Sequence, residues 1–328
     1  MSFKDIIGQE KPINILKNAL LNDRLAHAYL FYGPSGSGKV FTALNFAKTL
    51  NCLNRSGAQT DCCDECASCK KIDSGNHIDV RWIDLLKGKS EISIEQIRQV
   101  QSQVNLRPYE ARYKIFSIQD AEYMNEEAQS ALLKTLEEPP AKSIIILTTA
   151  NPESLLTTIV SRCQSVKFYP LGIERTRDML IKRFNIENAA AYFMAHIAQS
   201  GLVDTAAFSK TDILKEKNKI IDDFNNFLDS PGAELPFLKE SNDNILLTLS
   251  TLLWWFRDLL IFKETNNTAM LANKDRLKDL SAYASKYNSL RLGEIINTVL
   301  KTARLLSDTN VSAKLALTVM ATDILSEV

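Results

Sequence analysis

The segment GPSGSGKV, residues 33–40, has the residue types and spacing of a loop that holds the phosphates of a nucleotide. Small glycines let backbone N–H groups of such a loop turn toward phosphate oxygens, and its lysine reaches the outer phosphates. The pattern normally ends with Ser or Thr, whose hydroxyl binds Mg²⁺, whereas this chain has valine. The candidate nucleotide-binding residues are Gly33, Gly36, Gly38, Lys39 and Val40. The segment predicts an ATP or ADP site, intact or damaged, with a plain glycine turn into a helix as the alternative.

A site that hydrolyses a nucleotide also needs an acidic side chain at the end of a second strand, where it holds the water of the metal ion. The candidate is KIFSIQDAE, residues 114–122, in which Gln119 precedes Asp120. An amide at the first of these positions offers a metal ion no charge, and Val40 cannot bind a hard cation. Because two metal-handling positions are altered in the same way, we expect a site that no longer catalyses hydrolysis.

Five of the six cysteines fall within eighteen residues, 52–69. In a reducing compartment such a cluster is typical of a metal site rather than of disulfides. Two-residue gaps in CDECASC, residues 63–69, let successive sulfurs face one point, and four thiolates close a tetrahedral Zn²⁺ site. The predicted ligands are Cys52, Cys63, Cys66 and Cys69, with Cys62 as a competitor of Cys63. The expected role is structural, and unliganded thiols are the alternative.

Short apolar runs alternate with helical patterns over the first half of the chain. A helical segment over 125–138 is stopped by Pro139 and Pro140, and SIEQ at 93–96 predicts a capping box that opens another helix. The expected strands cover residues 28–32, 80–84, 114–118, 144–148 and 166–169. Strands that alternate with helices predict an α/β domain, a parallel sheet with helices on both faces.

Beyond Pro170 the strand patterns fade, and helical patterns dominate to the end of the chain. We therefore expect an α/β domain over residues 1–170 with a metal module at about 52–69. A small helical unit over 171–208 and an all-helical domain over 209–328 are expected to follow.

The 39 Lys and Arg residues balance the 39 Asp and Glu residues, so the formal net charge is zero. This gives no global attraction to nucleic acid or to an anionic membrane, and any DNA contact must be local or shared with partners. The first residues carry no apolar stretch of a secretory signal, and we see no run of the roughly 18–20 apolar residues that span a bilayer. We expect a cytoplasmic protein without membrane partners.

Several sequence blocks together resemble one known family. They are FKDIIGQ at 3–9, HAYLF at 27–31, SALLKTLEEPP at 130–140, TANP at 149–152 and SRC at 161–163. These blocks are similar to those of the AAA+ clamp-loader subunits of bacterial DNA polymerase III, strongly over residues 1–170 and more weakly beyond. The resemblance implies a P-loop parallel-sheet domain with a zinc module, a helical lid and a helical collar that assembles a hetero-pentameric ring. It also adds Asp120 and Thr149 to the nucleotide-contacting positions.

Two branches of this family compete. The motor subunits, gamma and tau, keep a complete phosphate loop, an acidic strand end and an arginine in the lid, whereas the delta-prime branch keeps the fold and lacks hydrolysis. Aligned on the SALLKTLEEPP block, the three motor positions fall on Val40, Gln119 and Val203, and all three are altered. The resemblance therefore implies a delta-prime-like subunit that is not catalytic on its own.

One motor-related residue is retained, the arginine of the SRC block, here Arg162. In the family this arginine projects into the ATP site of the neighbouring subunit, and a finger given in trans raises turnover by roughly 10³–10⁵. The implied partners are gamma/tau and delta subunits and, through the complex, the sliding clamp and primed DNA. Three alternatives stay open: an active gamma/tau-like ATPase or other AAA+ DNA-remodelling motor, a stand-alone nucleotide sensor and, for Arg162, a plain surface arginine.

Overall fold

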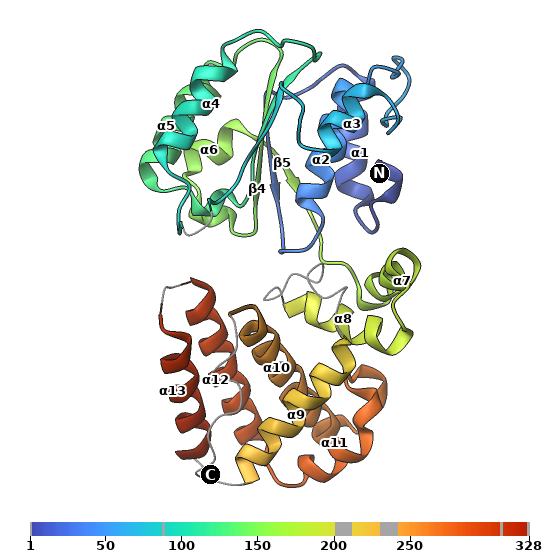
Figure 1. Ribbon diagram of the computed structural model, residues 1–328, viewed down its shortest axis with the longest axis vertical. Coiled ribbons are helices and arrows are strands. Elements are labelled where there is room, and N and C mark those ends of the chain that lie inside the picture. The colour runs from blue at the N-terminus through green and yellow to red at the C-terminus, as the bar shows by residue number, and fades with distance from the viewer. Residues whose placement is uncertain (1, 87–88, 201–211, 230–241, 309–310, 327–328) are drawn as a thin grey trace. The chain divides into compact units, whose positions relative to one another are not determined.

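The computed structural model describes residues 2–86, 89–200, 212–229, 242–308 and 311–326. The chain divides into two compact units, Met1–Leu171 and Gly172–Val328, and each is described by itself. The first is an α/β unit and the second is helical (Figure 1). The glycine loop and the cysteine cluster both belong to the first unit.

Five parallel strands form the sheet of the first unit, as the sequence predicted. The strands are β1 (Ala28–Tyr32), β2 (Val80–Ile83), β3 (Lys114–Ile118), β4 (Ser143–Thr149) and β5 (Gln164–Lys167). Their order across the sheet is β2-β3-β4-β1-β5, so β4 and β5 flank β1. The last strand was expected over residues 166–169, but it begins and ends two residues earlier. Its first two residues, Gln164 and Ser165, were missed because they are exposed and polar and carry no apolar strand signal.

Helices cover both faces of this sheet. Along β1, Tyr29 and Phe31 enter one apolar core, whereas Leu30 enters the other. The helices are α1 (Glu10–Leu21), α2 (Lys39–Asn51), α3 (Ala67–Asp73), α4 (Ile94–Val104), α5 (Glu126–Glu137) and α6 (Thr157–Arg162). Figure 1 shows α1, α2 and α3 on one side of the sheet and α4, α5 and α6 on the other. Burial on both faces explains why the strands read as continuous apolar runs.

The second unit is built of helices in the part of the chain that the structure describes. They are α7 (Ile173–Phe184), α8 (Asn188–Ser200), α9 (Ile213–Asp229), α10 (Asn242–Thr265), α11 (Leu277–Ala284), α12 (Ser289–Asp308) and α13 (Ala313–Ser326). Their side chains share one apolar core, to which Leu180 of α7, Trp255 of α10 and Leu317 of α13 belong. The expected boundary between lid and collar, at 208–209, lies outside the described residues, so that division stays a prediction.

One helix, α10, has a segment that is long and apolar enough to cross a membrane, Asn244–Thr265. The sequence analysis looked for uninterrupted apolar runs, which Arg257 and Asp258 break here, and so it did not single out this segment. However, 67% of the apolar window is buried within the protein. Asp258 is itself fully buried and accepts hydrogen bonds from the backbone and side-chain N–H groups of Asn273, at 2.8 and 2.9 Å. These are the properties of a core helix in a helical domain.

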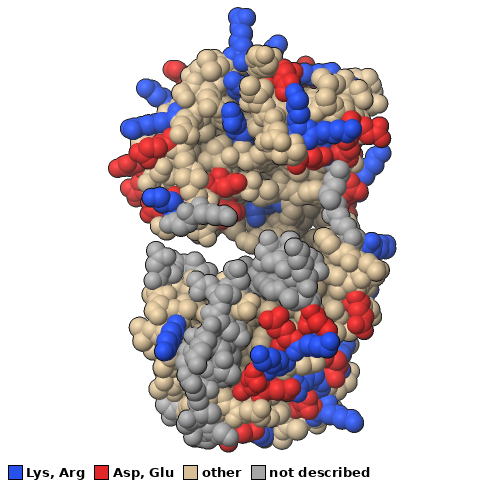
Figure 2. Space-filling model, viewed as in Figure 1, with Lys and Arg blue, Asp and Glu red and all other residues tan. Residues whose placement is uncertain are grey.

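Acidic and basic side chains are interspersed on the face of the molecule that Figure 2 shows. This pattern agrees with the formal net charge of zero. A surface that binds nucleic acid through phosphates alone gathers Lys and Arg on one face. Among the described residues drawn on this face, Lys and Arg do not gather into one extended area.

Candidate nucleotide and metal sites

The glycine loop connects β1 to α2, as a phosphate-binding loop must. Gly33, Gly36 and Gly38 have φ angles of 144°, 70° and 88°, a region that side chains disfavour. A Cβ atom on Gly33 would lie 2.4 Å from the carbonyl oxygen of Phe168, beside the end of β5. The Gly33 N–H donates a hydrogen bond to the carbonyl of Thr149, at 3.2 Å. The loop is thus held between the carboxyl ends of β4 and β5.

The lysine of the loop is bonded to the loop itself. Lys39 is 5% exposed, and its Nζ donates hydrogen bonds to the carbonyl oxygens of Gly33 and Pro34, at 2.7 and 2.9 Å. Burial lowers the pKa of Lys39, although the carboxylates of Glu122 and Asp120 act in the opposite direction. In this arrangement two backbone carbonyl groups occupy the hydrogen-bonding positions that a phosphate would take on the Lys39 ammonium group.

Two carboxylates lie near the lysine at the carboxyl end of β3. Asp120 adopts a left-handed conformation, φ 45°, and its N–H donates to the Thr148 hydroxyl at 3.2 Å. Glu122 accepts a hydrogen bond from the Ala150 N–H at 2.9 Å. Partial loss of hydration and the Glu122 carboxylate both raise the pKa of Asp120. The sequence reasoning missed Glu122, although its position two residues after Asp120 was a usable signal.

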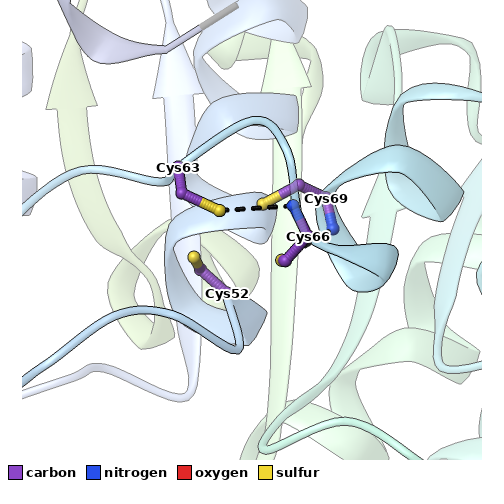
Figure 3. Close-up of side chains that lie close together, drawn as sticks. All are labelled: Cys52, Cys63, Cys66 and Cys69. Atoms are coloured by element: carbon purple, nitrogen blue, oxygen red, sulfur yellow. Dashed lines mark hydrogen bonds between the residues drawn. The ribbon is translucent and has the colours of Figure 1, made fainter.

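The cysteine cluster assembles as predicted: the sulfur atoms of Cys52, Cys63, Cys66 and Cys69 lie within 4.8 Å of one another (Figure 3). Cys52 follows α2, while Cys66 caps the N-terminus of α3. The backbone N–H groups of Cys66 and Cys69 point to the sulfurs of Cys63 and Cys66, at 3.3 and 3.5 Å. Burial raises the pKa of Cys66, but the backbone N–H groups of Cys69 and Leu53 and the thiols of Cys69 and Cys63 outweigh it and lower the pKa to about 6. The group has the geometry to hold a metal ion.

The sequence left the choice between Cys62 and Cys63 open, and the two thiols point in different directions. Cys63 faces the cluster, whereas the Cys62 thiol lies 3.4 Å from a carboxylate oxygen of Asp64. Burial raises the pKa of Cys62 to about 12, against the effect of the nearby Lys48 ammonium group. The Lys48 side chain is fully buried and forms ion pairs with Asp64 and, at 2.9 Å, with Asp73. Lys48 therefore ties α2 to the cysteine segment and to α3.

Arg162 is the last residue of α6, and its guanidinium group is bonded to its own chain. Nη1 donates to the carbonyl oxygen of Thr158 at 3.1 Å, and Nη2 donates to the carboxylate of Glu137 at 2.7 Å. The side chain is 35% exposed. The guanidinium group is thus partly exposed at the surface, and two of its five N–H groups have the hydrogen bonds given above.

Family models match both parts of the chain. One described as "DNA polymerase III, delta subunit" matches residues 8–172, and one described as "DNA polymerase III, delta subunit, C terminal" matches residues 212–325. The chain belongs to the clamp-loader subunits of DNA polymerase III. Subunit delta′ of Bacillus subtilis is 31% identical to this clamp-loader chain over 313 residues, with 92% of each chain covered.

Subunit tau of Bacillus subtilis, also a clamp-loader relative, is 32% identical over 293 residues. This match covers 80% of the present chain and 50% of tau, so the chain spans about half the length of that relative. A DNA polymerase III gamma-subunit-related protein from Thermotoga maritima has a TM-score of 0.50 at 16% identity, covering 96% of this chain and 99% of its own. That likeness shows the fold alone.

The family expected from the sequence is therefore confirmed, and the predicted clamp-loader positions can be placed. The structure gathers the loop with Lys39, Asp120 and Thr149 at one edge of the sheet. It places Arg162 elsewhere in the same unit, at the end of α6. The lid position Val203 lies outside the described residues.

Proposed function

We propose that this clamp-loader subunit is delta-prime-like: it does not hydrolyse ATP and instead offers Arg162 to the ATP site of a neighbouring gamma/tau-type subunit. The complex would load the sliding clamp on primed DNA. The observation that carries the proposal is that both positions expected to handle Mg²⁺, Val40 and Gln119, lack an anionic or hydroxyl oxygen. Without the ion, nothing bridges and neutralises the β- and γ-phosphates during transfer.

Two further contacts argue against productive nucleotide binding. Lys39 would have to give up its bonds to Gly33 and Pro34 before it could reach a phosphate. Moreover, the carboxylates of Asp120 and Glu122 near Lys39 repel a polyphosphate when no cation lies between them. If ATP or ADP binds, Gly33, Gly36, Gly38, Lys39 and Thr149 are the residues that would hold it.

The second candidate function, an active gamma/tau-like ATPase, is favoured by one observation, the pair of carboxylates at Asp120 and Glu122. ATP turnover by the purified chain, alone and with primed DNA, separates the two candidates. Our proposal expects no turnover from the chain alone and a large loss of turnover in the assembled complex when Arg162 is replaced by alanine. Turnover by the isolated chain that Lys39→Ala abolishes would establish the ATPase instead.

We also assign a structural zinc ion to the cysteine cluster. The donor set fits, because four soft thiolates are the usual ligands of a closed zinc site. Zinc–sulfur bonds of about 2.3 Å place the four sulfurs about 3.8 Å apart in a tetrahedron. The observed cluster, within 4.8 Å, is close to this geometry. Such an ion would clamp the segment 52–69 onto α2 and the sheet.

The second unit is assigned to ring assembly with gamma/tau and delta subunits in the cytoplasm. A groove of about 410 Å³ lies between α12 and α13, lined in part by Leu305, Leu315 and Val319. These side chains are 42%, 60% and 50% exposed, which is unusual for adjacent large apolar residues and is typical of a protein interface. Leu315→Glu should therefore reduce co-elution with partner subunits in gel filtration, whereas Thr318→Glu, on the same helix outside the groove, should not.

A further inference from the structure

We propose that Glu137 is the positioning residue of the Arg162 finger: its carboxylate holds the guanidinium group in the orientation that the neighbouring ATP site receives. This inference rests on the proposed role of Arg162 in trans. Glu137 would touch neither the nucleotide nor the phosphate being transferred. Its effect on turnover would pass entirely through Arg162.

Arg162 uses only some of its N–H groups for hydrogen bonds to the described residues of its own chain. A guanidinium group is a rigid plane with five N–H donors. Two of them are engaged, one with the Thr158 carbonyl at 3.1 Å and one with Glu137 at 2.7 Å. These two hydrogen-bond acceptors, the two anchors of the group, fix the orientation of the guanidinium plane, whereas one acceptor alone would let the group rotate. The other three N–H groups have no hydrogen bond to a described residue, and a phosphate oxygen of the partner could accept from them.

The two anchors belong to helices that are locked together, so the fold itself sets their separation. The Gln129 side chain of α5 donates to the carbonyl of Ser154 at 3.3 Å and accepts from the N–H of Leu156 at 2.8 Å. Leu156 is the residue that precedes α6. Leu132 and Ile159 of the two helices also share one buried core. The position of Glu137 relative to Thr158 is therefore rigid.

The ion pair is too exposed to be explained by stability alone. The side chains of Arg162 and Glu137 are 35% and 51% exposed, and surface pairs of this kind add little to the stability of a fold. A pair that orients the Arg162 guanidinium group can instead affect the rate of ATP turnover, because the orientation of a catalytic group affects the rate. The next residue, Glu138, is exposed as well, and its carboxylate has no hydrogen bond or ion pair among the described residues. Glu138 is thus a matched control.

The test measures ATP turnover in the complete complex with its ATPase subunits, clamp and primed DNA. It compares the wild type with Glu137→Gln, Glu138→Gln, Arg162→Ala and the double variant Glu137→Gln/Arg162→Ala. We expect Glu137→Gln to lower kcat about two- to fivefold, the range set by one exposed charged contact, with the KM for ATP unchanged. Glu138→Gln should match the wild type. The double variant should match Arg162→Ala, because Glu137 has no role once the finger is gone.

Three results would overturn the inference: wild-type kcat for Glu137→Gln, a higher kcat for Glu137→Gln, or an additional loss in the double variant. A higher kcat would mean that Glu137 restrains the finger rather than positions it. An additional loss would mean that Glu137 acts by another route. Failure of the underlying function has a different signature. If the complex with Arg162→Ala kept full turnover, Arg162 would have no role in the neighbouring ATP site.

Discussion

Replacing Cys63 with serine should release a metal ion from the first unit, whereas the same replacement of its neighbour Cys62 should not. The two residues are adjacent in the chain, but only Cys63 places its sulfur within 4.8 Å of the other three thiols. Cys62 points to Asp64 instead. The pair therefore tests the metal site with identical chemistry at consecutive positions.

The structural consequence can be worked out from Lys48. Its buried ammonium group depends on Asp64 in the cysteine segment and on Asp73 at the end of α3. If metal loss loosens this segment, the buried charge loses partners, and breaking a buried pair costs roughly 3–5 kcal/mol. The carboxylates are 30% and 37% exposed, so we take the lower end, about 3 kcal/mol. For a unit of this size that corresponds to a fall in Tm of roughly 6–12 °C.

The assay combines zinc content by mass spectrometry with thermal unfolding in the presence and absence of a chelator. We expect one zinc per chain for the wild type and Cys62→Ser, and less than one for Cys63→Ser. Chelation should lower the Tm of the first two proteins toward that of the third. Zinc retained in full by Cys63→Ser, or lost from Cys62→Ser, would refute the assignment of ligands.

Two other predictions concern the scaffold of the first unit. Gly33→Ala should lower the free energy of unfolding by more than the roughly 1–3 kcal/mol of a strained backbone, because the added Cβ would also meet the Phe168 carbonyl. Gly36→Ala has open space around its Cβ and should lower the free energy of unfolding by less. Urea unfolding measures both. Burial raises the pKa of Asp79, but N–H donors from Tyr109, Glu110 and Ala111 outweigh it and lower the pKa below its ordinary value. This stabilisation is present above about pH 4 and is lost as the pH falls through the lower, folded-state pKa. Asp79→Asn should therefore lower the free energy of unfolding by about 2–3 kcal/mol at pH 7. In unfolding curves measured at acid pH, this difference from the wild type should shrink. A difference that stays constant with pH would contradict the explanation.

The elements that the sequence predicted well are those whose signals are local. The strands of the central sheet are buried on both faces, so each is a short apolar run that can be recognised without its neighbours. The first residues of β5 were missed because an edge strand can be polar. The burial of Asp258 in α10 could not be predicted from the sequence, because its hydrogen-bond partner, Asn273, is brought to it only by the fold.

The sequence by itself determined which residue types were available: a glycine loop without a metal-binding hydroxyl, five clustered cysteines at metal-binding spacing and the arginine of the SRC block. Only the tertiary structure decided how they are used. It turned Cys62 away from the cluster, bonded Lys39 to its own loop and placed Glu137 against Arg162, 25 residues further along the chain. The physical reason is that hydrogen bonds and ion pairs depend on distances of about 3 Å, which the folding of helices against a sheet sets between residues far apart in sequence.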